Sequence, residues 1–186
     1  MSAGWRRTIA ALLVLTAAAC CLGCERRPRF GYDFEDERVL DELQWSCGTL
    51  FLVSADHATS GNRSLEVSLY PAAESVTEHY PGVSFSGFDA DWSGRRALVF
   101  DVFNPEDTAV ALEVRIDDRE SPDYRDRFNR THTLAPGGNR ISIPLASLVT
   151  SGTRRQLDLR RIRVVSLFLV NPGERHTLYL DRVGLE

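Results

Sequence analysis

The sequence contains no lysine, so all 22 of its basic residues are arginine. The 26 acidic residues outnumber them and leave a formal net charge of −4. Without a basic block or a net positive charge, the chain lacks the electrostatic attraction on which nucleic-acid-binding proteins depend. We therefore expect no nucleic-acid partner. Because lysine is absent from every position, we interpret the arginines as a compositional habit of the genome, and an arginine alone is not evidence of a site.

Cysteine is scarce outside one short stretch. Three of the four cysteines, Cys20, Cys21 and Cys24, lie near the start of the chain, and only Cys47 lies further along. A single cysteine in the body of the chain leaves no internal disulfide to stabilise an exported domain, which must then depend on its apolar core. With 43% hydrophobic residues in 186, the chain is long enough for one such domain plus a tail. No histidine motif accompanies Cys47, and we interpret it as a buried thiol.

Motifs of common enzyme classes are also missing. The chain has no Gly-x-Ser-x-Gly, no His-Glu-x-x-His and no phosphate-binding loop pattern. Carboxylates are abundant, but their spacing does not separate a glycosidase pair from surface acids. We therefore expect a protein that is not an enzyme.

The first residues are typical of an export signal. Arg6 and Arg7 precede an apolar run of 15 residues, Ile9 to Gly23, and a polar segment, Glu25 to Arg29, follows it. The run is shorter than the roughly 20 residues that span a bilayer. A positive start, an apolar run and a small-residue end predict a secretory signal peptide.

The end of this run, Cys20-Cys21-Leu22-Gly23-Cys24, resembles the leader of a bacterial lipoprotein. The resemblance implies a signal peptide over 1–23, a lipidated Cys24 with a short tether over 24–29, and an exported protein. Such a protein is anchored to the lipid bilayer of the bacterial cell envelope and faces the periplasm or the cell surface. Cys20 and Cys21 remain alternatives for lipidation, and an ordinary signal peptide or an uncleaved anchor remains the alternative to the lipoprotein.

The body of the chain indicates strands separated by turns. Apolar residues alternate with polar ones, which places one face of each segment in a core. Two stretches, Ala97 to Phe103 and Ile162 to Val170, are apolar on both faces and predict central strands. Helical spacing is limited to Val39, Leu40 and Leu43 and to Leu145 to Val149. We predict an all-β, two-sheet antiparallel β-sandwich whose alternating apolar sets are Leu65, Val67 and Leu69; Val110, Leu112, Val114 and Ile116; Ile141 and Ile143; and Leu178 and Leu180.

Four segments together resemble a carbohydrate-binding-module domain of the galactose-binding-like jelly-roll type. They are Tyr32–Glu35, Ala58–Val67, Asp91–Gly94 with Ala97–Asn104, and Thr177–Val183. The resemblance covers 30–186 and implies a jelly roll that binds a glycan or polysaccharide without catalysis. Similar domains occur beside glycoside hydrolase and agarase catalytic domains. With nothing after Glu186 in this sequence, we expect the module to stand alone on its lipid anchor.

The resemblance also implies a structural calcium ion. The matching residues are Asp33, Glu35 and Asp181, together with carbonyls around Ser60 to Asn62, and calcium prefers six to eight such oxygen ligands. These residues meet only if the first and last strands pair. The alternative is that the three carboxylates are solvated charges at strand ends.

The densest mixture of aromatic and polar residues lies between Asp117 and Arg130, which we predict to be a loop joining two strands. Sugars stack on aromatic rings and bond to planar polar groups, so we predict ligand contacts from Asp117, Tyr124, Arg127 and Asn129, with Trp92 as a possible platform. The alternatives are a salt-bridged surface loop and a Trp92 that packs inside the sandwich. A second function class also stays open: an envelope interaction or assembly module that binds protein or peptidoglycan with the same sandwich.

Overall fold

The computed structural model describes residues 30–46, 48–73, 76 and 78–186. The predicted signal peptide, the lipidation of Cys24 with its alternatives, the tether over 24–29 and the buried thiol of Cys47 lie outside these residues and stay predictions. Within the described part of the chain, no helix is both long enough and apolar enough to cross a bilayer.

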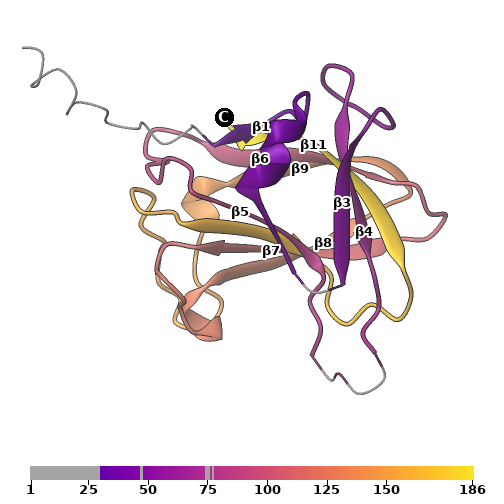
Figure 1. Ribbon diagram of the computed structural model, residues 1–186. Coiled ribbons are helices and arrows are strands. Elements are labelled where there is room, and N and C mark those ends of the chain that lie inside the picture. The colour runs from indigo at the N-terminus through magenta and orange to yellow at the C-terminus, as the bar shows by residue number, and fades with distance from the viewer. Residues whose placement is uncertain (1–29, 47, 74–75, 77) are drawn as a thin grey trace, which may run out of the picture.

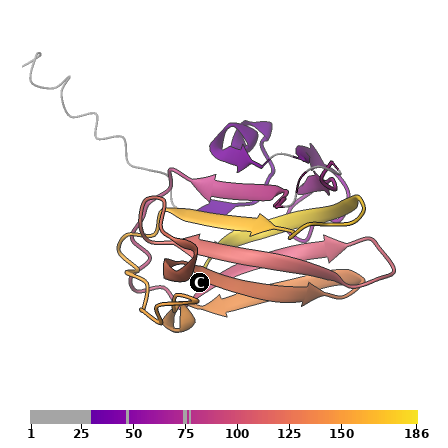
Figure 2. The same cartoon turned by 90° about the horizontal axis from the view of Figure 1, so that it is seen from below.

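The predicted antiparallel β-sandwich is confirmed. One sheet has six strands, and the other has five (Figure 1). The six-stranded sheet has the order β3 (Thr49–Ser54), β4 (Ser64–Leu69), β11 (His176–Leu185), β6 (Ala97–Asn104) and β9 (Gly137–Pro144), and β1 (Gly31–Tyr32) pairs with β11. The five-stranded sheet has the order β2 (Leu43–Trp45), β5 (Gly82–Ser86), β10 (Val164–Phe168), β7 (Val110–Asp117) and β8 (Phe128–Leu134). Figure 2 shows β5, β10, β7 and β8 side by side across one face of the molecule.

The alternating apolar residues form the core between the sheets. Leu65, Leu112 and Leu178 each expose 2% or less of their surface, as the two-residue period predicts. The two stretches that are apolar on both faces are central strands: β6 lies between β11 and β9, and β10 lies between β5 and β7. The two segments with helical spacing form short 3-10 helices, η1 (Glu37–Glu42) and η3 (Leu145–Ser147).

An aromatic cluster fills one region of the core and contains Trp92. The Trp92 ring lies 5.1 Å from that of Phe30 and 5.8 Å from that of Phe88, measured between centroids, and Trp92 is fully buried. Aromatic pairs at such distances stabilise a core beyond the area that they bury. The prediction of Trp92 as a ligand platform is therefore wrong, because no face of the ring reaches the surface, and the packing alternative holds.

The first and last strands pair, with Gly31 opposite Gly184 and Tyr32 opposite Val183. Figure 1 shows the C-terminus beside β1. This pairing is the condition under which Asp33, Glu35 and Asp181 come near the same turn.

Candidate ligand-binding cleft

The outer face of the five-stranded sheet carries a polar row that crosses all five strands. The strand register places Gln44, Ser84, Ser166, Arg115 and Asn129 opposite one another. Alternate residues of the same strands, such as Val165 and Val114, point into the core and are buried. The row therefore lies on the outward face of the sheet. Four of its residues, Ser84, Ser166, Arg115 and Asn129, form part of the floor of a cleft of about 750 Å³.

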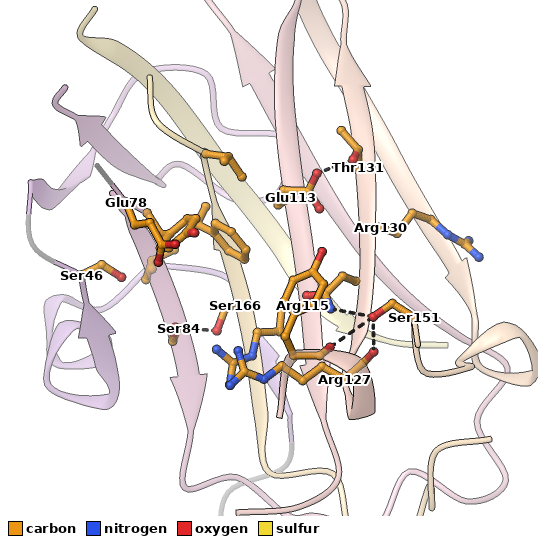
Figure 3. A pocket seen from close by; sticks show the side chains of 17 residues that line it. Ser46, Glu78, Ser84, Glu113, Arg115, Arg127, Arg130, Thr131, Ser151 and Ser166 are labelled. Atoms are coloured by element: carbon orange, nitrogen blue, oxygen red, sulfur yellow. Dashed lines mark hydrogen bonds between the residues drawn. The ribbon is translucent and has the colours of Figure 1, made fainter. Parts of the chain in front are cut away.

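The floor continues into a second row with one aromatic ring. Phe168 of β10 lies opposite Glu113 of β7, and Glu113 lies opposite Thr131 of β8. The Thr131 hydroxyl donates to Glu113 Oε1, and the hydroxyls of Ser84 and Ser166 in the first row lie 2.7 Å apart. Figure 3 shows Glu113, Thr131, Ser84 and Ser166 among the side chains that line the cleft. The floor therefore presents hydroxyl, amide, carboxylate and guanidinium groups at neighbouring positions.

Two arginines lie at one side of the cleft. Arg115 Nε donates to both carboxylate oxygens of the buried Asp117, at 3.0 Å each. Arg127 Nε donates to the carbonyl of Pro122 at 2.7 Å. Figure 3 shows the Arg115 and Arg127 side chains next to each other. Partial burial first, and then the positive charge of Arg115, lowers the pKa of Arg127 below its ordinary value.

Tyr124 stands on the adjacent wall and is 69% exposed. It begins the 3-10 turn η2 (Tyr124–Asp126), which packs against the loop around Ser151. Ser151 Oγ lies 3.2 Å from the carbonyl oxygens of Tyr124 and Arg127, and Asn129 Nδ2 donates to the same hydroxyl at 3.2 Å. These contacts fix the wall to strand β8.

Ion pairs between the half-buried Arg155 and two carboxylates, Asp126 and the buried Asp118, support this wall. Arg155 Nη2 donates to Asp118 Oδ1 at 2.8 Å, and Arg155 Nε donates to Asp126 Oδ1 at 3.1 Å. Burial alone would raise the pKa of Asp118, but the hydrogen bonds from Arg155 and from the Asp158 amide outweigh it and leave the pKa below its usual value. The end of β7, the turn η2 and the 150–158 loop are thereby linked through one guanidinium.

The far wall carries Tyr80 and Val170, which are 43% and 50% exposed. The Tyr80 ring meets the Phe168 ring edge to face, with centroids 5.9 Å apart. The cleft therefore has an exposed tyrosine on each of two sides, with the polar floor between them.

Three of the five predicted ligand-binding residues, Tyr124, Arg127 and Asn129, line this cleft. The fourth, Asp117, is 2% exposed and reaches the cleft only through Arg115. The fifth, Trp92, lies in the core. The predicted loop from Asp117 to Arg130 is also shorter than expected, because 128–130 belong to β8 and Phe128 is buried. Part of that loop is salt-bridged, as the alternative held: Arg119 Nη1 lies 2.6 Å from Asp126 Oδ2.

Several cleft residues were missed by the sequence reasoning. Ser84 and Ser166 are too common as residue types to single out, and only the strand order brings them together. Glu113 and Arg115 did carry a signal, because they occupy the polar positions of a strand whose apolar positions are clear.

The predicted calcium residues meet at a different place, the turn over 59–63. Asp181 Oδ2 accepts the amide N–H groups of Thr59 and Ser60, both at 2.7 Å, and Glu35 Oε1 accepts those of Asn62 and Arg63 at 2.7 and 2.9 Å. Asp33 Oδ1 accepts the amide of Glu35 instead.

These contacts bear on whether the corner fits a calcium ion. Calcium needs carbonyl and carboxylate oxygens directed at one point, whereas here N–H groups of the turn face the carboxylates. No group of three or more His, Cys, Asp or Glu side chains that suits a metal ion exists among the residues described. The corner in this arrangement does not fit the ion, and calcium binding stays a prediction that requires these bonds to be exchanged.

No protein-family model and no curated protein matches the chain. Solved structures do resemble it in fold. The family 11 carbohydrate-binding module from Clostridium thermocellum, in complex with a β-1,3-1,4-mixed-linked tetrasaccharide, has a TM-score of 0.62 and 19% identity, over 84% of this chain and 95% of that chain.

Two further structures show the same sandwich. A carbohydrate-binding module of family 28, described as specific for non-crystalline cellulose, has a TM-score of 0.56 and 15% identity over 83% of this chain and 92% of that one. An exo-β-agarase has a TM-score of 0.66 and 16% identity, but the match covers 86% of this chain and only 25% of the enzyme. At these identities the comparisons establish the fold: this chain has the β-sandwich of carbohydrate-binding modules.

Proposed function

We propose that this protein is a non-catalytic glycan-binding module whose ligand lies in the cleft on the five-stranded sheet. The observation that carries the proposal is the polar row from Ser84 to Asn129, set beside the exposed rings of Tyr124 and Tyr80. Sugar rings offer an apolar face for stacking and hydroxyls for hydrogen bonds, and a binding site needs both kinds of partner within reach.

The structural neighbours support this assignment. The family 11 module was solved with an oligosaccharide, and the family 28 module is described by its cellulose specificity. Proteins with one fold often differ in function. The cleft residues of this chain are therefore the main support for glycan binding, and the similarity in fold is secondary.

We place the module on the bacterial cell envelope, anchored by acylated Cys24. The support is the resemblance of 1–29 to a lipoprotein leader. Two acyl chains or more give stable anchoring, and the lipoprotein pattern supplies them.

Affinity electrophoresis of the purified chain in gels with β-1,3-1,4-glucan, cellulose derivatives, xylan, agarose or acidic polysaccharides tests the proposal. We expect retardation by at least one polysaccharide and its loss in Tyr124→Ala. Leu50→Ala is the matched control, because Leu50 is 64% exposed on β3 of the other sheet. A chain that no polysaccharide retards would refute the glycan function. Release of reducing sugar by the pure protein would refute its non-catalytic nature.

One observation favours the second function class, an interaction module. Leu50 and Leu52 on the edge strand β3 are 64% and 51% exposed, and Leu52 shares a register row with Glu66, Tyr179 and Phe103 of the six-stranded sheet. Edge strands with exposed apolar residues readily pair with or pack on another chain. If this face were the functional one, Leu50→Ala with Leu52→Ala would abolish binding to an envelope fraction while Tyr124→Ala would not.

A further inference from the structure

The cleft contains a guanidinium group without a carboxylate partner. Arg127 forms no ion pair with any residue that the structure describes, and its one side-chain hydrogen bond goes to the neutral carbonyl of Pro122. The carboxylates of Asp117 and Asp123 favour the charged form of Arg127 through space, but neither is paired with it, and Asp117 is bound to Arg115. The guanidinium of Arg127 is therefore available to pair with an anionic group of a bound ligand.

The neighbouring Arg115 faces the same space. Its Nε and Nη2 atoms are taken by Asp117, so its charge is balanced, while its side chain still lies beside Arg127 in Figure 3. Arg127 lies beside this ion pair and is not part of it, so an anion that binds at Arg127 does not have to displace Asp117 from Arg115. Planar guanidinium forks match the geometry of carboxylates and of other oxyanions.

The other charged groups restrict where an anion can lie. Glu113 lies in the next floor row and is bonded to Thr131, and Glu78 lies near Ser46 on the far side (Figure 3). Arg130 packs over the Phe128 ring at 5.1 Å and points away from the other cleft side chains. One side of the cleft thus attracts an anion and the remainder favours hydroxyl groups.

We propose that the glycan bound by this cleft is acidic, with a carboxylate or sulfate group held by Arg127 beside Arg115 and neutral parts of the sugar chain over the floor. The inference rests on the proposed function and names the ligand class.

Binding of the full chain to four soluble polymers tests this: polygalacturonate and alginate for the carboxylate, a sulfated galactan for the sulfate ester, and β-1,3-1,4-glucan as the neutral reference. We expect at least one acidic polymer to bind about tenfold or more tightly than the neutral one, since hydrogen bonds to charged groups exceed neutral ones by about that factor. The preferred acid identifies the source of the anion.

Arg127→Gln should lower affinity for the acidic polymer about tenfold or more and leave affinity for neutral glucan within about threefold. Arg140→Gln is the matched control, because it removes one arginine charge from β9 of the opposite sheet. Since Arg127 also bonds to Pro122, circular dichroism of each variant checks the fold. A measurement without any variant adds to this: acidic binding should weaken as sodium chloride rises, and neutral binding should not.

The results separate the two proposals. Binding of neutral glucan that equals or exceeds binding of every acidic polymer would overturn the acidic ligand and leave the glycan function intact. Equal losses of acidic and neutral binding in Arg127→Gln, or equal losses in Arg127→Gln and Arg140→Gln, would also overturn it. Absence of binding to all four polymers would overturn the acidic ligand. The glycan function would fall only if the polysaccharides in the affinity gels also failed to retard the chain.

Discussion

Asp117 and Arg115 are two residues apart on β7 and form an ion pair in which the carboxylate is buried and the guanidinium is partly exposed. The Asp117 side chain is 2% exposed and that of Arg115 is 27% exposed. Because residues at i and i+2 of a strand share one face, the buried carboxylate is correctly placed to orient the cleft arginine.

Replacing Asp117 by Asn should therefore affect both stability and ligand binding. We expect the free energy of unfolding to fall by about 1–3 kcal/mol, because a partly buried arginine loses its charged partner. Urea denaturation measures the fall. Asp123→Asn is the control, since Asp123 is exposed and we expect a change within about 0.5 kcal/mol. Equal effects of the two substitutions would show that the pair does not stabilise the sheet.

Trp92 and Tyr124 should respond to substitution in opposite ways. Trp92→Ala should lower the free energy of unfolding by about 3–5 kcal/mol, because it leaves a cavity beside Phe30 and Phe88. Tyr124→Ala should change it by less than about 0.5 kcal/mol, because the ring is 69% exposed, and should weaken glycan binding. Thermal unfolding and binding titrations on both variants check this. A stable Trp92→Ala that fails to bind would restore Trp92 as a ligand contact.

Acid should unfold the protein partly through Asp118. The pKa of Asp118 is lowered in the folded chain, so its stabilising contribution is present above the unfolded pKa of about 3.9 and is lost as the pH falls through the lower, folded value. We expect the urea midpoint of the wild type to fall from about pH 4 downward. Asp118→Asn should have a lower urea midpoint at neutral pH, and its midpoint should fall less than that of the wild type as the pH is lowered. Asp107→Asn, in an exposed turn, should have the same pH dependence as the wild type.

Gly61 should tolerate no side chain. Its φ is +64°, and an added Cβ would lie 2.3 Å from Glu35 Oε1. We expect Gly61→Ala to cost about 1–3 kcal/mol of stability, from the left-handed backbone and from displacement of Glu35. Gly138→Ala is the control, because no atom lies within 4 Å of its added Cβ. Equal unfolding midpoints for the two variants would contradict the proposed contact.

The same corner allows a direct test of calcium. If Glu35 and Asp181 exchange their amide bonds for a cation, the ion stabilises the folded state by mass action, and a chelator lowers the melting temperature. An unchanged melting temperature in chelator and in excess calcium would refute the predicted site.

The sequence predicted the sandwich well where alternation was clear. The segments around Leu65, Val110, Ile141 and Leu178 are strands, and the two segments that are apolar on both faces are central strands. It missed β5, because Gly82, Ser84 and Ser86 give that strand a turn-like composition. Of its serines, Ser84 lines the cleft, so its polarity faces outward and not into the core.

The candidate site was predicted only in part, for a physical reason. Tyr124, Arg127 and Asn129 are close in sequence, so composition alone grouped them. Ser84, Ser166 and Arg115 are brought together by hydrogen bonding between strands that are far apart in the chain. Trp92 was misplaced because its polar neighbours, Asp91 and Ser93, are exposed while its own side chain turns inward.

The position of β11 has a consequence for how the protein reaches its folded state. β11 lies between β4 and β6 and also pairs with β1, so the six-stranded sheet lacks its central strand until residues 176–185 have been synthesised. A growing chain would expose the unpaired edges of β4 and β6, which are sites for aggregation. Folding dominated by such distant pairings is slow, in the range of milliseconds to seconds. The sandwich must therefore fold after synthesis of its last strand, and a chaperone that shields β4 and β6 until then would raise the yield of native protein.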